Sequence, residues 1–94
     1  MGAQGTATLD FGSTPSVEAS VAVTGQAAIL ATSVAEAWVM GAITAGNDEN
    51  AHLFAGVGMR LTCGIPVAGT GFTIYGTIFS GLADGTFTVQ WAWL

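Results

Sequence analysis

The chain has 94 residues, of which 51% are hydrophobic and only 7% are charged, and six acidic side chains with a single basic one give a net charge of −5. A chain of this length is expected to form one β domain over 1–94, because two domains would each fall near the minimum size for a core. The acidic balance excludes an electrostatic nucleic-acid binder and a polybasic membrane-surface binder, since both need a basic face.

Short apolar runs separated by glycine-containing turns predict an all-β domain. The first two predicted strands, 6–11 and 17–23, alternate apolar and polar residues with a period of two. The segment between them contains Gly12 and Pro15, residue types that favour turns.

The segment 27–44 is ambiguous between strand and helix. Its alanines and the capping-box pattern from Ser33 to Glu36 favour a helix, whereas its β-branched and aromatic residues favour strands. We predict two strands, roughly 27–31 and 34–44, with a short helix as the alternative.

The same region is the one membrane candidate, because 27–45 contains 19 residues with a single charge, close to the length of about 20 that a spanning helix needs. Glu36 lies at its middle, where a charge costs about 3 kcal/mol. No Lys or Arg flanks the segment. A membrane span is therefore not expected.

The second half of the chain is predicted to form three further strands, 52–63, 72–79 and 86–94. The last is the clearest, because four large apolar residues share one face: Phe87, Val89, Trp91 and Trp93. About seven strands in all predict a compact antiparallel sandwich, jelly roll or small barrel.

No constellation of titratable residues predicts an enzyme. His52 and Cys63 are the only histidine and cysteine, and an odd separation on one predicted strand would point them to opposite faces. The densest polar cluster is Asn47, Asp48, Glu49 and His52. Its spacing matches no EF-hand loop, and two carboxylates make a weak metal site. We expect no metal and no cofactor; the cluster is kept as a candidate binding loop, with a solvated polar loop as the simpler interpretation.

The tryptophans and the single arginine are the candidate interface residues. Trp91 and Trp93 would suit a carbohydrate platform or a protein contact, although their shared apolar face favours the core. Trp38 shares a predicted strand face with Glu36 and is expected to be partly exposed. Arg60 would pair with an acid, either on a neighbouring subunit or at the surface of its own chain.

Four segments with strand and turn patterns cover much of the chain: 21–26 (VAVTGQ), 36–39 (EAWV), 67–75 (VAGTGFTIY) and 87–93 (FTVQWAW). In these segments the chain resembles small β-rich proteins encoded among the virion structural genes of tailed bacteriophages. The resemblance carries no catalytic signature. It implies a virion component, such as a capsid decoration (cement) protein or a tail or fibre accessory, and decoration proteins of this size are commonly trimeric.

The low charge and the resemblance together predict a non-enzymatic virion structural protein. A surface with few charges is a solubility risk unless it is covered, and assembly into a homo-oligomer covers it. The expected partners are copies of this chain, as a trimer or another homo-oligomer, and virion proteins such as the major capsid protein. The alternative is a glycan- or receptor-binding module of a phage tail or fibre, which would use Trp38 or the loop at 45–52.

Overall fold

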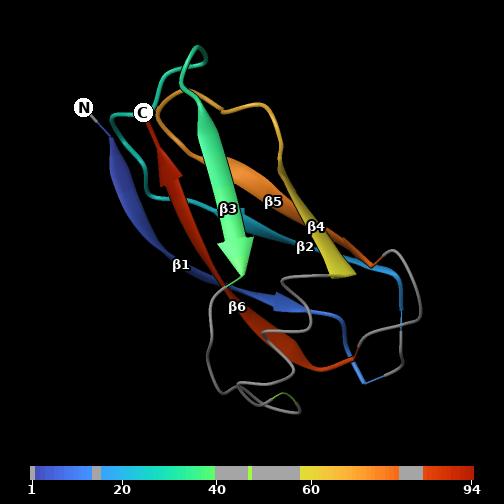
Figure 1. Ribbon diagram of the computed structural model, residues 1–94. Helices are drawn as coiled ribbons and strands as arrows, with labels where there is room; N and C mark the ends of the chain where they lie inside the picture. The colour runs from blue at the N-terminus through green and yellow to red at the C-terminus, as the bar shows by residue number, and fades with distance from the viewer. Residues whose placement is uncertain (1, 14–15, 40–46, 48–57, 79–83) are drawn as a thin grey trace.

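The computed structural model describes residues 2–13, 16–39, 47, 58–78 and 84–94, and six β-strands lie in them (Figure 1). The strands are β1 (Ala3–Asp10), β2 (Glu18–Val23), β3 (Ala35–Val39), β4 (Met59–Cys63), β5 (Phe72–Ile78) and β6 (Thr86–Trp93). Every pairing between them is antiparallel. The predicted all-β class is therefore confirmed.

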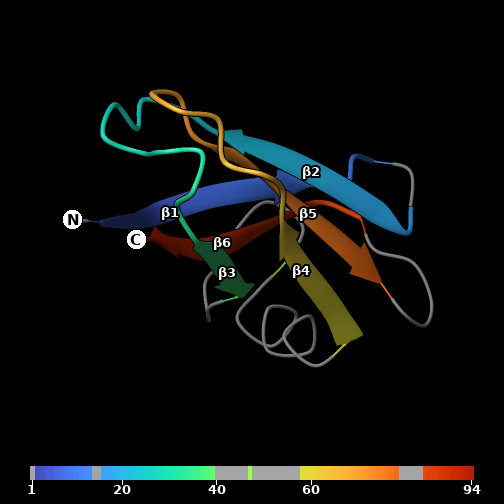
Figure 2. The ribbon, with the colours of Figure 1, turned by 90° about the horizontal axis from the view of Figure 1, so that it is seen from above.

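The six strands form two three-stranded sheets that lie as two layers (Figure 2). Sheet I has the strand order β1-β6-β3, and sheet II has the order β2-β5-β4. Strand β1 of sheet I comes close to β2 of sheet II, and β3 comes close to β4. Each edge of one sheet therefore approaches an edge of the other.

The core lies between the sheets and is built from alternate residues of the strands. The buried hydrophobic residues are Leu9, Phe11, Val23, Ile29, Met59, Phe72, Ile74, Phe87, Val89, Trp91 and Trp93. Aromatic rings meet edge to face in two pairs, Phe11 with Phe87 and Phe72 with Trp91, each with ring centroids 5.8 Å apart. This geometry brings the positive edge of one ring to the negative face of the other. Strand β6 supplies four core residues at every second position, which confirms its predicted period of two.

The predicted strand at 27–31 is wrong. Residues 27–28 and 31–32 form turns, and the N–H of Gly69 donates a hydrogen bond of 2.9 Å to the carbonyl of Ile29 between them. The Ile29 side chain is buried and closes one end of the core. A loop that places an apolar residue in the core can have the same short run of apolar residues in its sequence as a buried strand, which explains the wrong prediction.

The helix alternative is also wrong for the described part of the segment, 27–39, where turns are followed by β3 from Ala35. The hydroxyl oxygen of Ser33 accepts a 3.0 Å hydrogen bond from the backbone N–H of Leu30, inside the preceding turn. A serine that bonds to nearby backbone supports a turn as readily as a helix start. The predicted strand at 34–44 is confirmed for 35–39, and its remainder lies outside the described residues.

The observed boundaries of the other strands differ from the predicted boundaries by a few residues. Strand β1 begins at Ala3 rather than at position 6, and the predicted strand at 52–63 appears as β4 from Met59 onward. Positions 52–57 lie outside the described residues. Without the strand at 27–31, the seven predicted strands become the six that the described residues form.

Gly71 determines how closely the loop before β5 approaches the end of β2. Its φ is 155°, and a Cβ at this position would overlap the carbonyl oxygen of Val23. The close approach lets the N–H of Gln26 donate a 2.9 Å hydrogen bond to the carbonyl of Thr70. The loop after β2 and the loop before β5 are thereby joined at the same end of the molecule.

Candidate interaction surfaces

One end of the molecule is made by two loops and the residue after β6. The loop 24–34 joins β2 to β3, and the loop 64–71 joins β4 to β5. Leu94 exchanges two backbone hydrogen bonds of 2.9 Å with Val34. The loop 64–71 is joined to the loop 24–34 by the hydrogen bond from Gly69 to Ile29, so the three segments lie together at this end.

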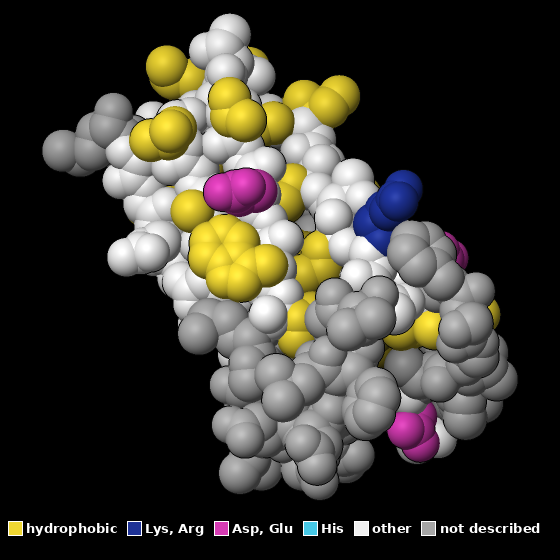
Figure 3. Space-filling view, viewed as in Figure 1, with side chains coloured by type: hydrophobic (Ala, Val, Ile, Leu, Met, Phe, Trp, Pro, Cys, Tyr) yellow, Lys and Arg dark blue, Asp and Glu magenta, His cyan; other side chains and the backbone are white. Residues whose placement is uncertain are grey.

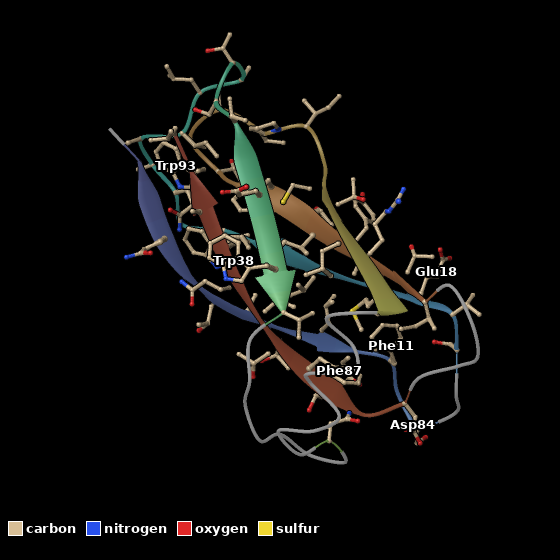
Figure 4. The ribbon with its side chains drawn as sticks, viewed as in Figure 1. Phe11, Glu18, Trp38, Asp84, Phe87 and Trp93 are labelled. Carbon is tan, nitrogen blue, oxygen red and sulfur yellow. The ribbon has the colours of Figure 1, made fainter. Side chains whose placement is uncertain are left out.

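This surface exposes five aliphatic side chains, each between 58% and 84% accessible to solvent: Leu30, Val34, Ile65, Val67 and Leu94. These five residues are called the apolar end below. Neither loop contains an Asp, Glu, Lys or Arg. Figure 3 shows hydrophobic side chains projecting at this end, and Figure 4 shows Glu18 and Asp84 at the other. The exposed aliphatic surface and these carboxylates are therefore far apart.

The outer face of sheet I carries Trp38, on the edge strand β3 (Figure 4). Its side chain is 41% exposed. The strand register places Trp38 opposite Gln90 of β6 and Gln90 opposite Thr6 of β1. An aromatic ring is thus followed across the sheet by an amide and a hydroxyl.

A hollow of about 570 Å³ lies on the same face, one row nearer the apolar end. Ala92 of β6 forms its floor, with Glu36 of β3 on one side and Gln4 of β1 on the other. Val34 and Leu94 line its end. The space exists because a short side chain lies between two longer ones, and its volume falls in the range of small-molecule sites, roughly 300–1,000 Å³.

The outer face of sheet II has a different character. Tyr75 of the central strand β5 is exposed and lies between Ser20 of β2 and Thr62 of β4. One row further along, Glu18 and Arg60 lie on opposite sides of β5. This face therefore carries hydroxyl groups and both signs of charge.

The four predicted interface residues fall into two groups. Trp91 and Trp93 are buried in the core, which confirms the core interpretation and leaves little of either ring for a partner. Trp38 and Arg60 are exposed on the outer faces of sheets I and II.

The apolar end was not predicted from the sequence, because its five residues do not recur at the spacing of a strand or a helix. The available signal was the presence of large aliphatic residues in loops without a single charge.

Asn47 is the predicted binding-loop residue that the structure describes. Its side-chain amide donates two hydrogen bonds of 2.9 Å, to the backbone carbonyls of Asp84 and Thr86. The amide therefore holds the start of β6. The other three residues of the predicted loop, Asp48, Glu49 and His52, lie outside the described residues.

Cys63 of β4 is partly buried against the core. Burial raises the pKa of its thiol, and the negative charge of Glu36 raises it further. A thiol with a raised pKa is a poor nucleophile at neutral pH. This environment supports the expectation of an inert thiol. His52, which was expected to point to the opposite face of the strand, lies outside the described residues.

Within the described ranges, no three His, Cys, Asp or Glu side chains gather into a group that could hold a metal ion. The same ranges contain no helix with the length and hydropathy needed to cross a membrane. Comparisons with protein-family models, with curated proteins and with solved structures found no match to this chain.

Proposed function

We propose that this chain is a non-enzymatic structural subunit, a small antiparallel sandwich that assembles with copies of itself through the apolar end. The phage resemblance suggests the virion as its setting, with the chain acting as a capsid decoration subunit that also contacts the major capsid protein. The observation that carries the proposal is the group of five exposed aliphatic side chains at one end of the molecule.

Exposure of these side chains is unfavourable in water. Full burial of one Val, Leu or Ile side chain is worth about 1.5–3 kcal/mol. Soluble monomers rarely expose large contiguous apolar patches, and such patches commonly mark interaction sites. An interface over the apolar end would convert this unfavourable exposure into binding free energy.

The charge distribution is compatible with a second copy as the occupant, because the loops of the apolar end carry no charge. Copies with a net charge of −5 repel one another, and like charges placed together at an interface cost several kcal/mol. Asp10 and Asp84 lie at the end of the molecule where β1 finishes and β6 begins, away from the apolar end. Contact through the two uncharged loops brings copies together while keeping Asp10 and Asp84 apart; Glu36, which lines the same hollow as Val34 and Leu94, is the carboxylate that such a contact must leave facing solvent.

Native mass, measured by light scattering after gel filtration in detergent-free buffer, tests the proposal. The expected result is one discrete multiple of the 9.4 kDa chain. Ile65→Asp places a charge at the apolar end and should reduce the mass to that of a single chain. Val17→Asp is the matched control, because Val17 is also an exposed β-branched residue but precedes β2, outside the apolar end.

Two results would contradict self-assembly. One is a wild-type protein that remains a single chain at high concentration. The other is an Ile65→Asp variant that stays folded by circular dichroism and keeps the wild-type mass.

The virion setting is tested separately, by co-expression with the major capsid protein encoded in the same genome: the chain should sediment with assembled capsids, and its absence from them would contradict the capsid role.

A second candidate function, a glycan- or receptor-binding module, rests on a different observation. The exposed ring of Trp38 lies on the outer face of sheet I, whereas Ile65 and Val67 belong to the loop that enters sheet II. The two candidate functions therefore depend on different residues and can be tested independently.

A further inference from the structure

We propose that the outer face of sheet I binds a neutral oligosaccharide, with one sugar unit in the hollow between Gln4 and Glu36 and the next stacked on Trp38. The face combines three elements that a saccharide site needs. It has an exposed aromatic ring, a hollow of suitable size, and polar side chains that can both donate and accept hydrogen bonds.

The hollow has an alanine floor, a polar side chain on each side and an apolar end. Ala92 of the central strand β6 lies between Glu36 and Gln4, which the strand register places on its two sides. Gly2 also lines the space. The Glu36 carboxylate accepts hydrogen bonds, and the Gln4 amide donates and accepts them. These groups match the hydroxyl groups around a sugar ring.

Trp38 and Gln90 occupy the adjacent row of the same face. Rows on one face of a strand are spaced by two residues, about 7 Å, which is comparable to one sugar unit with its linkage. An oligosaccharide with one sugar unit in the hollow therefore places its next unit over the indole of Trp38. The faces of the indole ring are the negative side of its quadrupole and attract the polarised C–H groups of a pyranose. Gln90 is placed to form hydrogen bonds with the hydroxyl groups of the same sugar.

The charge on this face favours a neutral ligand. Glu36 repels phosphate, sulfate and uronic acid groups, and the described residues of β1, β3 and β6 contain no Lys or Arg. Arg60 lies on sheet II, on the other side of the core. An anionic ligand would therefore meet only repulsion on this face.

Intrinsic fluorescence provides a direct readout, because Trp91 and Trp93 are buried and Trp38 is exposed. Acrylamide quenching should report mainly on Trp38. Titration with cellohexaose, maltohexaose and chitotetraose is expected to give a saturable change with at least one of them, at a dissociation constant of about 1 mM or below. The same sugar should protect Trp38 from acrylamide.

Two variants test the geometry. Binding by the variants is measured by isothermal titration calorimetry, because Trp38→Ala also removes the fluorescent reporter. Trp38→Ala removes the stacking ring and should abolish binding, and Ala92→Leu fills the hollow and should weaken binding about tenfold or more while leaving Trp38 in place. Tyr75→Ala is the matched control, because Tyr75 is an exposed aromatic residue on the outer face of sheet II. Binding by Tyr75→Ala should equal that of the wild type.

The proposal is overturned if none of the three oligosaccharides binds at concentrations up to about 10 mM, or if Trp38→Ala binds as well as the wild type. All titrations are repeated in the Ile65→Asp background. Val34 and Leu94 belong both to the apolar end and to the hollow, so assembly could cover the hollow. Binding by the single-chain variant separates a failure of this site from a failure of self-assembly.

Discussion

The indole Nε1 of Trp93 donates a 2.9 Å hydrogen bond to the side-chain carbonyl oxygen of Gln26. Trp93 is the last residue of β6 and lies in the core, whereas Gln26 belongs to the loop after β2. The backbone N–H of Gln26 also donates to the carbonyl of Thr70. Gln26 thus connects sheet I, the loop 24–34 and the loop 64–71.

Gln26→Leu should therefore destabilise the fold. The substitution leaves the buried indole N–H without its acceptor, and an unsatisfied buried donor costs about 1–3 kcal/mol. Urea denaturation followed by circular dichroism measures the loss. Gln4→Leu is the control, because Gln4 is exposed on β1. Equal denaturation midpoints for the two variants would show that the Trp93–Gln26 bond contributes nothing.

Gly71→Ala should be among the most destabilising single substitutions in the chain. A Cβ at Gly71 overlaps the carbonyl oxygen of Val23, so the loop 64–71 must move away from β2. Gly25→Ala is a matched comparison, since Gly25 has a φ of 76° but no atom near the position of a Cβ. Gly25→Ala should reduce the free energy of unfolding only by the strain of an alanine in the left-handed region, about 1–2 kcal/mol. Thermal unfolding compares the two, and a Gly25→Ala variant as unstable as Gly71→Ala would contradict the steric explanation.

Asn47→Ala should loosen the start of β6. The substitution removes both donors that hold the carbonyls of Asp84 and Thr86, and each hydrogen bond is worth about 0.5–1.5 kcal/mol. Asn47→Asp has nearly the same shape but no N–H to donate, so it should lose as much stability or more. Hydrogen exchange measures local opening, with faster exchange expected at the first residues of β6. An Asn47→Asp variant with wild-type exchange rates would argue that the two bonds are not formed.

Cys63 should react slowly with iodoacetamide. Burial, and to a lesser degree Glu36, raises the pKa of the thiol, so the thiolate is scarce in the folded protein near pH 8. The alkylation rate should rise at a higher pH than for the urea-unfolded chain, whose thiol titrates near pH 8.5. Glu36→Gln should speed the reaction modestly. A rate equal to that of the unfolded chain would contradict the buried environment.

The same pKa shift predicts the sign of a stability change. The folded thiol holds its proton more tightly than the unfolded one, so its contribution to stability is complete below the unfolded pKa and decreases as the pH rises above it. The free energy of unfolding should therefore fall as the pH rises above about 8.5, the pKa of an unfolded cysteine thiol. Cys63→Ser should reduce this dependence on pH.

The strands with regular alternation could be predicted from the sequence. In β6 every second residue is large and apolar, and such a pattern fits only a strand with one buried face. The loop at 27–31 could not be predicted in this way. The side chain of Ile29 is packed in the core, and its backbone is held by one hydrogen bond from Gly69 in the distant loop 64–71 rather than by a partner strand; a local pattern contains no information about that contact.

The candidate surfaces were predicted only in part. The exposure of Trp38 could be predicted because Trp38 and Glu36 share one face of the strand. A glutamate is rarely buried without a partner, so that face was expected to be exposed to solvent. The structural role of Asn47 depends on backbone carbonyls 37 and 39 positions away, so its polar neighbours suggested a surface loop instead. The apolar end is formed by three segments that meet only in the folded chain.

The pairing of β1 with β6 also determines when the protein can fold during synthesis. Ala3 lies opposite Trp93, so β1 leaves the ribosome 90 positions ahead of its partner. At about 5–20 residues per second, β1 waits roughly 5–20 seconds without a neighbouring strand. Sheet II is complete once residue 78 has emerged, whereas neither β1 nor β3 can pair within sheet I until β6 is present. Because β6 comes last in the chain and is the central strand of sheet I, this sheet forms and the core closes only after every strand of sheet II has been synthesised.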